Sequence, residues 1–374
     1  MLVGHAENKK YFGESDGFIK VDVTKKYSQK ELILQDFMDV EYVVLEATDE
    51  FVNQGNVMSI GKEYITVRND LNDGNIYIYD RNGKAFRVIN RKGLGSEEYT
   101  FISLIIIDED KDEMFVYDHR IKKILVYDLY GKFKRFLLCK ENVMYLEIFE
   151  YDKDNLICCN ETATSLYGTN NVESFYIISK QDGSIVKEME VSYKQKTTSP
   201  TANISNEPVT ILRKFPIAPL NGDFIVSLFS SDTIFRYLPD HSMKPFIIRT
   251  PSVQSMNPEV FLFLGILTEN YYFMSIVKKD PKAQGGLNMR DIMYDKQKKV
   301  FYENYTIYNN DFRGRTEDLY KRTRSDEVAY WNKNEAFELI EANKQGKLKG
   351  KLKEIADRLD EDANPVIMLV KHKK

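Results

Sequence analysis

Charged side chains gather in two short stretches of the chain where a ligand could bind. Arg91 and Lys92 stand before a glycine-rich segment, and Asp118, His119 and Arg120 follow an apolar run. Guanidinium, ammonium and imidazole groups donate hydrogen bonds to a ligand, and a carboxylate accepts them. We predict that these five residues contribute to a ligand-binding site, provided that the two stretches meet at one face of the fold. The alternative for the Asp-His-Arg trio is a solvated hairpin turn.

Two tyrosines border long polar segments and could stack on sugar rings. Tyr167 lies within Glu161–Asn171 and Tyr193 precedes Lys194–Glu207, while a third polar segment spans Lys278–Met289. Long loops on a rigid scaffold commonly carry binding specificity. We expect the three segments to form a ligand-binding face, with disordered decoration of the surface as the alternative.

Residues for metal binding or nucleophilic catalysis do not occur in a familiar spacing. No two of His5, His119, His241 and His372 lie three or four residues apart, and Cys-x-x-Cys is missing, so we expect no zinc site. Gly-x-Ser-x-Gly is also missing. We therefore predict no catalytic residues, no metal and no cofactor. The alternative is a Ca²⁺ ion held at the centre of the fold by oxygen ligands from different repeats.

The composition favours an all-β protein and excludes several functional classes. The chain has 374 residues, of which 43% are hydrophobic and 13% aromatic. Aromatic and β-branched side chains in short runs are typical of strands. A formal net charge of −4 gives no basis for binding nucleic acid, and no apolar stretch could cross a bilayer as a helix. The adjacent Cys158 and Cys159 lie in a strand-like run, where we expect burial between layers.

A repeated pattern of strands runs through most of the chain. Asn75–Lys84 reads NIYIYDRNGK and Lys123–Lys132 reads KILVYDLYGK, each an apolar strand followed by a glycine turn. A third copy lies at Ser174–Ser184, and weaker ones at Thr233–Asp240 and Asp291–Lys299. Each copy has further apolar runs before and after it, which makes four strands per repeat. Repeats of this kind predict a six-bladed β-propeller with four-stranded antiparallel blades.

The two ends of the chain should close the ring. Gly346–Glu361 has apolar residues at helical spacing, so we expect one C-terminal helix there, followed by a strand at Val366–Val370. Closure requires an early strand beside that last one, because an open ring would expose sheet edges. Tyr42–Ala47 is the natural candidate, with Phe18–Val23 as a further addition. We expect the sixth blade to contain, besides these strands, Glu327–Trp331 and Glu335–Glu341.

Several segments resemble a known family. YVVLEATDE at 42–50, the strand pair around IYIYDRNGK, RKGLGSEEY at 91–99, and the ending LKEIA with Asn364–Val370 carry the resemblance. The chain is similar, over residues 18–374, to secreted or lipid-anchored bacterial six-bladed β-propellers related in architecture to the NHL-repeat proteins. The resemblance implies the fold and export. It brings no characterised activity.

The resemblance also bears on domain organisation and location. We expect a flexible segment at residues 1–17 and a single propeller domain at 18–374. Residues 1–17 lack the apolar core of a signal peptide, which fits either a cytoplasmic protein or an exported one whose leader is absent from this sequence. Following the family, we expect the periplasm or a lipid anchor in the outer membrane.

These features together predict a binding protein. We expect a monomeric, non-catalytic binding or scaffold propeller of the bacterial cell envelope. It would recognise a ligand, with a glycan among the candidates, or an envelope protein at the face that bears the long loops. The alternative is a propeller enzyme of the lactonase or lyase type with a metal in the central channel.

Overall fold

The computed structural model describes residues 17–141, 143–160, 175–189, 191, 201–204, 207–210, 216–228, 230–279, 288–319, 323, 325 and 327–373. Residues 1–16 of the expected N-terminal segment, Tyr167, Tyr193 and most of the three long polar segments lie outside these ranges. None of the helices within them is long and apolar enough to span a membrane.

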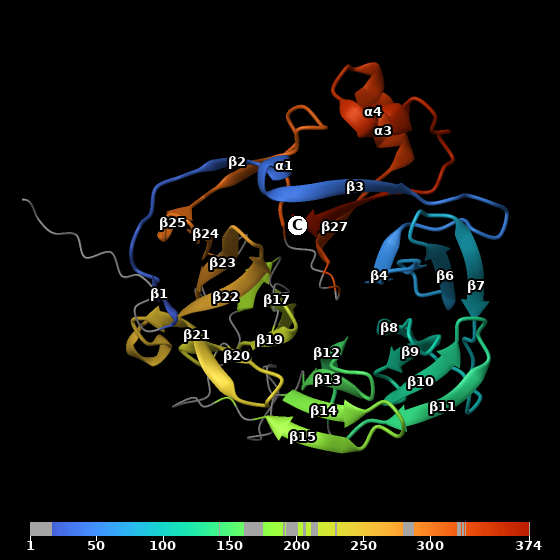
Figure 1. Cartoon of the computed structure of the whole chain (residues 1–374), viewed down its shortest axis with the longest axis horizontal. Helices are drawn as coiled ribbons and strands as arrows, with labels where there is room; N and C mark the ends of the chain where they lie inside the picture. The colour runs from blue at the N-terminus through green and yellow to red at the C-terminus, as the bar shows by residue number, and fades with distance from the viewer. Residues whose placement is uncertain are drawn as a thin grey trace, which may run out of the picture.

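The strands form six sheets arranged as blades around a central axis, which confirms the predicted all-β propeller (Figure 1). Five blades contain four consecutive antiparallel strands, with the first strand of each nearest the axis. Blade one consists of β4 Asn56–Ile60, β5 Tyr64–Arg68, β6 Asn75–Asp80 and β7 Ala85–Asn90. Blade two consists of β8 Leu104–Asp108, β9 Glu113–Asp118, β10 Lys123–Asp128 and β11 Phe133–Leu138. Blade three consists of β12 Tyr145–Glu150, β13 Asn155–Asn160, β14 Phe175–Ser179 and β15 Ile185–Met189.

The next two blades follow the same order. Blade four consists of β18 Ile217–Leu220, β19 Asp223–Val226, β20 Thr233–Tyr237 and β21 Met243–Thr250. Blade five consists of β22 Val260–Leu267, β23 Tyr271–Lys278, β24 Asn288–Asp295 and β25 Val300–Glu303. Two small sheets lie outside the blades: the antiparallel pair β16 Thr201–Ile204 and β17 Glu207–Thr210, and the parallel pair β2 Glu31–Ile33 and β26 Thr306–Tyr308.

Both ends of the chain meet in blade six, as the sequence predicts. This sheet has the order β27 Val328–Asn334, β28 Val366–His372 and β3 Met38–Val44. β28 pairs antiparallel with β3 along its whole length, from Val366 opposite Val44 to His372 opposite Met38. Val366–Val370 is entirely buried, so the closing strand is part of the core. An early strand thus covers the edge of the last one.

Two expectations about the strands near the chain ends are wrong. Glu335–Glu341 does not form a strand but falls largely within helix α3, Ala336–Lys344, because Ala336, Leu339 and Ala342 make one buried helical stripe. Phe18–Val23 does not join blade six. Its strand β1, Ile19–Asp22, runs parallel to β21 as a fifth strand of blade four, where Ile19 and Val21 fill a core shared with blade five.

The C-terminal helix is present as α4, Gly350–Ala356, and is shorter than predicted. It begins late because Gly346 adopts a positive φ of 66° and Lys349 is extended, which keeps the preceding residues out of the helix. A short helix α1, Leu34–Phe37, and the 3₁₀ turn η1, Val253–Ser255, complete the elements.

The repeated Tyr-Asp-x-x-Gly-Lys signature forms a turn that packs against the neighbouring blade. Asp80 Oδ1 accepts hydrogen bonds from the backbone N–H groups of Asn82 and Lys84, both at 2.9 Å. Asp128 Oδ1 accepts the equivalent bonds from the N–H groups of Tyr130 and Lys132. Gly83 has a φ of +89°, and a Cβ atom there would lie 2.1 Å from the carbonyl oxygen of Val44 in the neighbouring blade. The glycine therefore allows the turn to touch that blade.

Strand direction divides the ring into two faces. We call the crossover face the one that carries the connections between blades and the turns between second and third strands, such as 69–74, 91–103 and 119–122. We call the hairpin face the one that carries the turns between first and second strands, such as 61–63, 109–112, 151–154 and 221–222. The first strands of blades one to five end at the hairpin face.

Hydrophobic clusters fill the spaces between neighbouring blades. Cys158 packs in a cluster with side chains of blade two, whereas Cys159 packs in one with side chains of blade four. Both thiols are fully buried, which confirms the expectation that adjacent residues of this strand face opposite layers.

Candidate functional site

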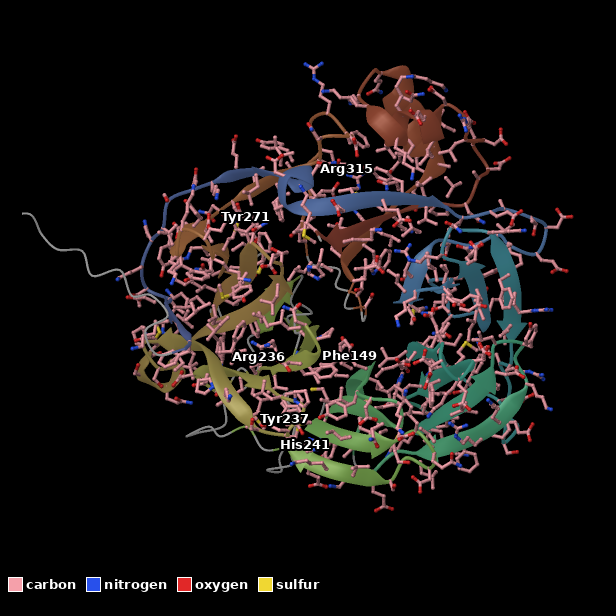
Figure 2. All side chains as sticks on the ribbon, in the orientation of Figure 1. Phe149, Arg236, Tyr237, His241, Tyr271 and Arg315 are labelled. Carbon is pink, nitrogen blue, oxygen red and sulfur yellow. The ribbon has the colours of Figure 1, made fainter. Side chains whose placement is uncertain are left out.

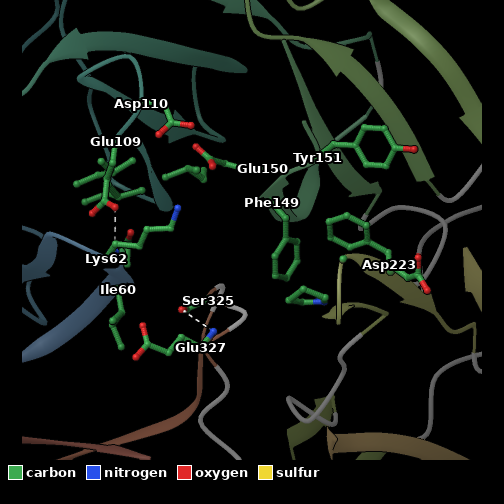
Figure 3. A pocket seen from close by; sticks show the side chains of 18 residues that line it. Ile60, Lys62, Glu109, Asp110, Phe149, Glu150, Tyr151, Asp223, Ser325 and Glu327 are labelled. Carbon is green, nitrogen blue, oxygen red and sulfur yellow. Dashed lines mark hydrogen bonds between the residues drawn. The ribbon is translucent and has the colours of Figure 1, made fainter. Parts of the chain in front are cut away.

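A cavity of about 400 Å³ opens at the hairpin face, where the first strands of blades one to four end around the axis (Figure 3). Its size falls in the range of small-ligand sites in proteins. The walls come from the ends of β4, β8, β12 and β18, the turns that follow these four strands, and residues 325 and 327 before β27. Each wall is thus a strand end fixed within a blade.

One side of the cavity is aromatic. Phe149 and Tyr151 lie at the end of β12, and Phe224 lies on β19 of the next blade. The ring of Phe224 is 6.1 Å from that of Phe149 and 5.8 Å from that of Tyr151, measured between centroids. Phe149 and Phe224 are mostly buried, while Tyr151 is partly exposed. Such rings can pack against the flat, apolar face of a ligand.

The other side carries charged groups. Lys62, Glu109 and Glu327 lie across the cavity from the aromatic rings (Figure 3). Glu109 of blade two accepts hydrogen bonds from the backbone N–H groups of Lys62, Glu63 and Tyr64 in blade one, at 2.8, 2.9 and 3.0 Å. These three bonds fix the Glu109 carboxylate and join the two blades at the rim of the cavity.

Glu150 stands out among the carboxylates that line the cavity. Burial raises its pKa to about 7; Lys180 opposes this shift, and the charges of Asp108 and Asp110 add to it. Lys180 Nζ donates to Asp108 Oδ2 at 2.7 Å but lies 3.7 Å from Glu150 Oε1. The ammonium group is therefore committed to Asp108, which leaves Glu150 only partly compensated.

Asp223 closes the cavity on the side of blade four. Its carboxylate forms an ion pair with Arg236 on β20. The pair leaves the guanidinium partly exposed, since 41% of the Arg236 side chain is accessible. Among the residues that the structure describes, no three His, Cys, Asp or Glu side chains come together as a metal site. The cavity lining offers aromatic surfaces, hydrogen-bond acceptors and the cation of Lys62.

The predicted binding residues of the first two stretches lie together, but at the crossover face. Asp118 is fully buried, and its Oδ2 accepts hydrogen bonds from the N–H groups of Thr100 at 2.7 Å and Phe101 at 2.9 Å. His119 Nδ1 lies 2.7 Å from Ser103 Oγ, and the Arg120 guanidinium covers the ring of Phe101 at 4.3 Å. These residues thus hold the crossover between blades one and two.

Arg91 and Lys92 belong to the same crossover, as predicted. The Arg91 Nε donates to the carbonyl oxygen of Gly131 at 2.8 Å, and the Lys92 Nζ donates to that of Asn72 at 2.7 Å. Both side chains, like that of Arg120, remain exposed at the crossover face. Their role in binding a ligand stays a prediction.

The sequence reasoning missed the residues of the cavity. Several of them occupy the same place in the repeat, directly after the first strand: Gly61 and Lys62, Glu109 and Asp110, and Tyr151. The signal was present, because the first strands of a propeller end at the same mouth of the channel. Reading the repeat register at that position would have gathered these residues.

Comparison with solved structures shows the same fold in a bacterial protein. A putative exported protein from Bacteroides fragilis NCTC 9343 superposes with a TM-score of 0.59 and 15% sequence identity, covering 94% of this chain and 100% of that chain. A member of the duf4221 family from Bacteroides vulgatus superposes with a TM-score of 0.47 and 9% identity, over 91% and 100% of the two chains. None of the curated proteins matches the sequence.

A family model matches residues 18–371, nearly the whole of the propeller and its closing strand. That match confirms the expected membership in an uncharacterised propeller family. The chain belongs to the family described as Domain of unknown function (DUF4934).

Proposed function

We propose that this protein is a binding propeller that recognises a carbohydrate in the cavity of the hairpin face. The observation that carries the proposal is the pairing of an aromatic wall with a charged wall across about 400 Å³. A sugar ring has an apolar face that packs on aromatic side chains and hydroxyl groups that donate to carboxylates. Phe149 and Tyr151 supply the aromatic side chains, and Glu150, Asp223 and Glu327 supply the carboxylates.

The location that we propose is the bacterial cell envelope, with the protein acting as a monomer. Two lines of support are the resemblance to secreted and lipid-anchored propellers and the putative exported protein of the same fold. An envelope propeller meets glycans directly, which fits a carbohydrate ligand.

The proposal is tested by a glycan microarray followed by calorimetry with the saccharides that bind. Tyr151→Ala should weaken binding about tenfold, the size expected for losing one stacked ring and its hydrogen bond. Arg120→Ala, at the crossover face, is the matched control and should bind like the unchanged protein. Binding that is lost in Arg120→Ala but kept in Tyr151→Ala would move the site to the crossover face. Shortened saccharides appearing during incubation would support the enzyme instead.

A further inference from the structure

Aromatic side chains continue outward from the cavity along the junction of blades three and four. Tyr151, which lines the cavity, stacks with His241 at a centroid distance of 6.0 Å and an interplanar angle of 18°. Tyr237 lies 5.9 Å from His241 and 6.2 Å from Tyr151, so the three rings form a cluster. In Figure 2, Phe149 lies near the axis, whereas Tyr237 and His241 lie nearer the rim. The cluster therefore extends from the cavity toward the outside of the ring.

His241 is held in a fixed position at the surface. It lies in the turn between β20 and β21, is exposed, and has a positive φ of 65°. The hydroxyl groups of Tyr237 and Tyr151 lie 2.7 and 3.2 Å from its Nδ1. No residue of the described part of the chain bonds to Nε2, so the second ring nitrogen is available to a ligand. An exposed aromatic ring whose outer edge carries a polar nitrogen can pack against a sugar unit and hydrogen-bond its hydroxyl groups.

Arg236 does not belong to this cluster. It lies opposite Ile225 in the pairing of β19 with β20, so its side chain and its ion-pair partner Asp223 are on the face of blade four that is turned toward blade five. Phe224 and Tyr237 lie on the other face, toward blade three.

We propose that Tyr151 and His241 form a second subsite, and that the ligand is an oligosaccharide lying across the junction of blades three and four. This inference rests on the proposed function, since the first sugar unit occupies the cavity. The corresponding turn of blade two shows that the feature is not general to the repeat. There Tyr130 is 66% exposed and contacts Phe86 and Arg87, none of which lines the cavity.

The test is calorimetry with cello-, malto- and xylo-oligosaccharides of one to six units, alongside any series identified on the array. We expect affinity to rise with chain length. His241→Asn keeps a residue that tolerates positive φ but removes the ring. It should weaken binding of the longer saccharides about fivefold and leave that of the monosaccharide unchanged. Tyr130→Ala is the matched control and should bind all lengths like the unchanged protein.

The outcomes separate the two proposals. If His241→Asn weakens all lengths equally, or none, the second subsite is wrong while the cavity stands. If no saccharide of any length binds the unchanged protein, the proposed function fails and the inference fails with it.

Discussion

Individual charged side chains in this protein differ mainly in how completely their neighbours neutralise them. Glu113 lies on β9, where burial alone would raise its pKa; hydrogen bonds from Arg135 and Lys134 instead lower it to about 2. Arg135 donates a hydrogen bond to each oxygen of the Glu113 carboxylate, at 2.8 and 2.6 Å. Glu150 has no comparable partner, and its pKa moves the other way. The two glutamates therefore differ in how well neighbouring cations compensate their charge, closely for Glu113 and only partly for Glu150.

Replacing Glu150 should reveal this difference as a pH dependence of stability. Because its pKa is raised in the folded state to about 7, ionisation costs stability as pH rises from about 4.5, the ordinary value, to 7. Glu150→Gln cannot ionise, so its advantage over the unchanged protein should grow by about 1 kcal/mol between pH 5 and pH 8, after allowance for solvent screening. Urea unfolding at both pH values measures it, with Glu141→Gln at an exposed turn as control. An advantage that is the same at both values would contradict the assignment.

The residue scale also shows where sequence reasoning stops. Asp118 and Arg91 were correctly predicted to share one face, because the repeat places both stretches at the same end of the strands. The sequence did not reveal that the Asp118 carboxylate would be buried and turned onto the backbone of Thr100 and Phe101. That arrangement depends on how residues 91–103 fold back over blade two, which no local pattern encodes.

At the scale of elements, the glycine turns explain why the repeat is visible in the sequence. The Asp carboxylate closes the turn, and the glycine permits a positive φ and a close approach to the previous blade. These needs are local, so the strands around them could be predicted from sequence. The segment Ala336–Lys344 could not, because its apolar residues fit a short strand as well as a helix. Its packing against β3 and β26 in one core cluster decides the outcome.

Substituting two of these glycines should separate backbone strain from crowding between blades. Gly83→Ala would place a Cβ atom 2.1 Å from the Val44 carbonyl oxygen at a φ of +89°. Gly222 has a similar φ of +81° but nothing within 4 Å of the same position. Gly222→Ala should therefore cost about 1 kcal/mol and Gly83→Ala about 3 kcal/mol of unfolding free energy. Chemical denaturation of both variants measures the difference. Equal losses would show that the blades can move apart freely at this turn.

For the whole molecule, stability depends on joining segments that are more than 300 residues apart. Asn364, just before β28, is buried and donates through its Nδ2 to the carbonyl oxygens of Glu46 and Phe51, at 2.9 and 2.7 Å. Its Oδ1 accepts a hydrogen bond from the backbone N–H of Asn53 at 3.0 Å. Asn364, in the C-terminal segment Asn364–Val370 noted in the sequence, therefore hydrogen-bonds the end of the chain to the segment that precedes blade one. A sequence pattern can suggest closure, but only folding brings these groups together.

Asn364→Ala should weaken the whole ring rather than one blade. The substitution leaves the carbonyl groups of Glu46 and Phe51 without the amide that satisfies them, at a cost of about 3 kcal/mol. Because β3 and β28 are fully paired in the core, their separation should expose blades one and six together, and unfolding should remain one cooperative transition at lower denaturant. Circular dichroism and fluorescence of Trp331, on β27, should therefore report the same reduced midpoint. Asn82→Ala, at an exposed turn, is the control. Fluorescence that changes well before circular dichroism would mean that blade six opens alone and that closure does not hold the ring together.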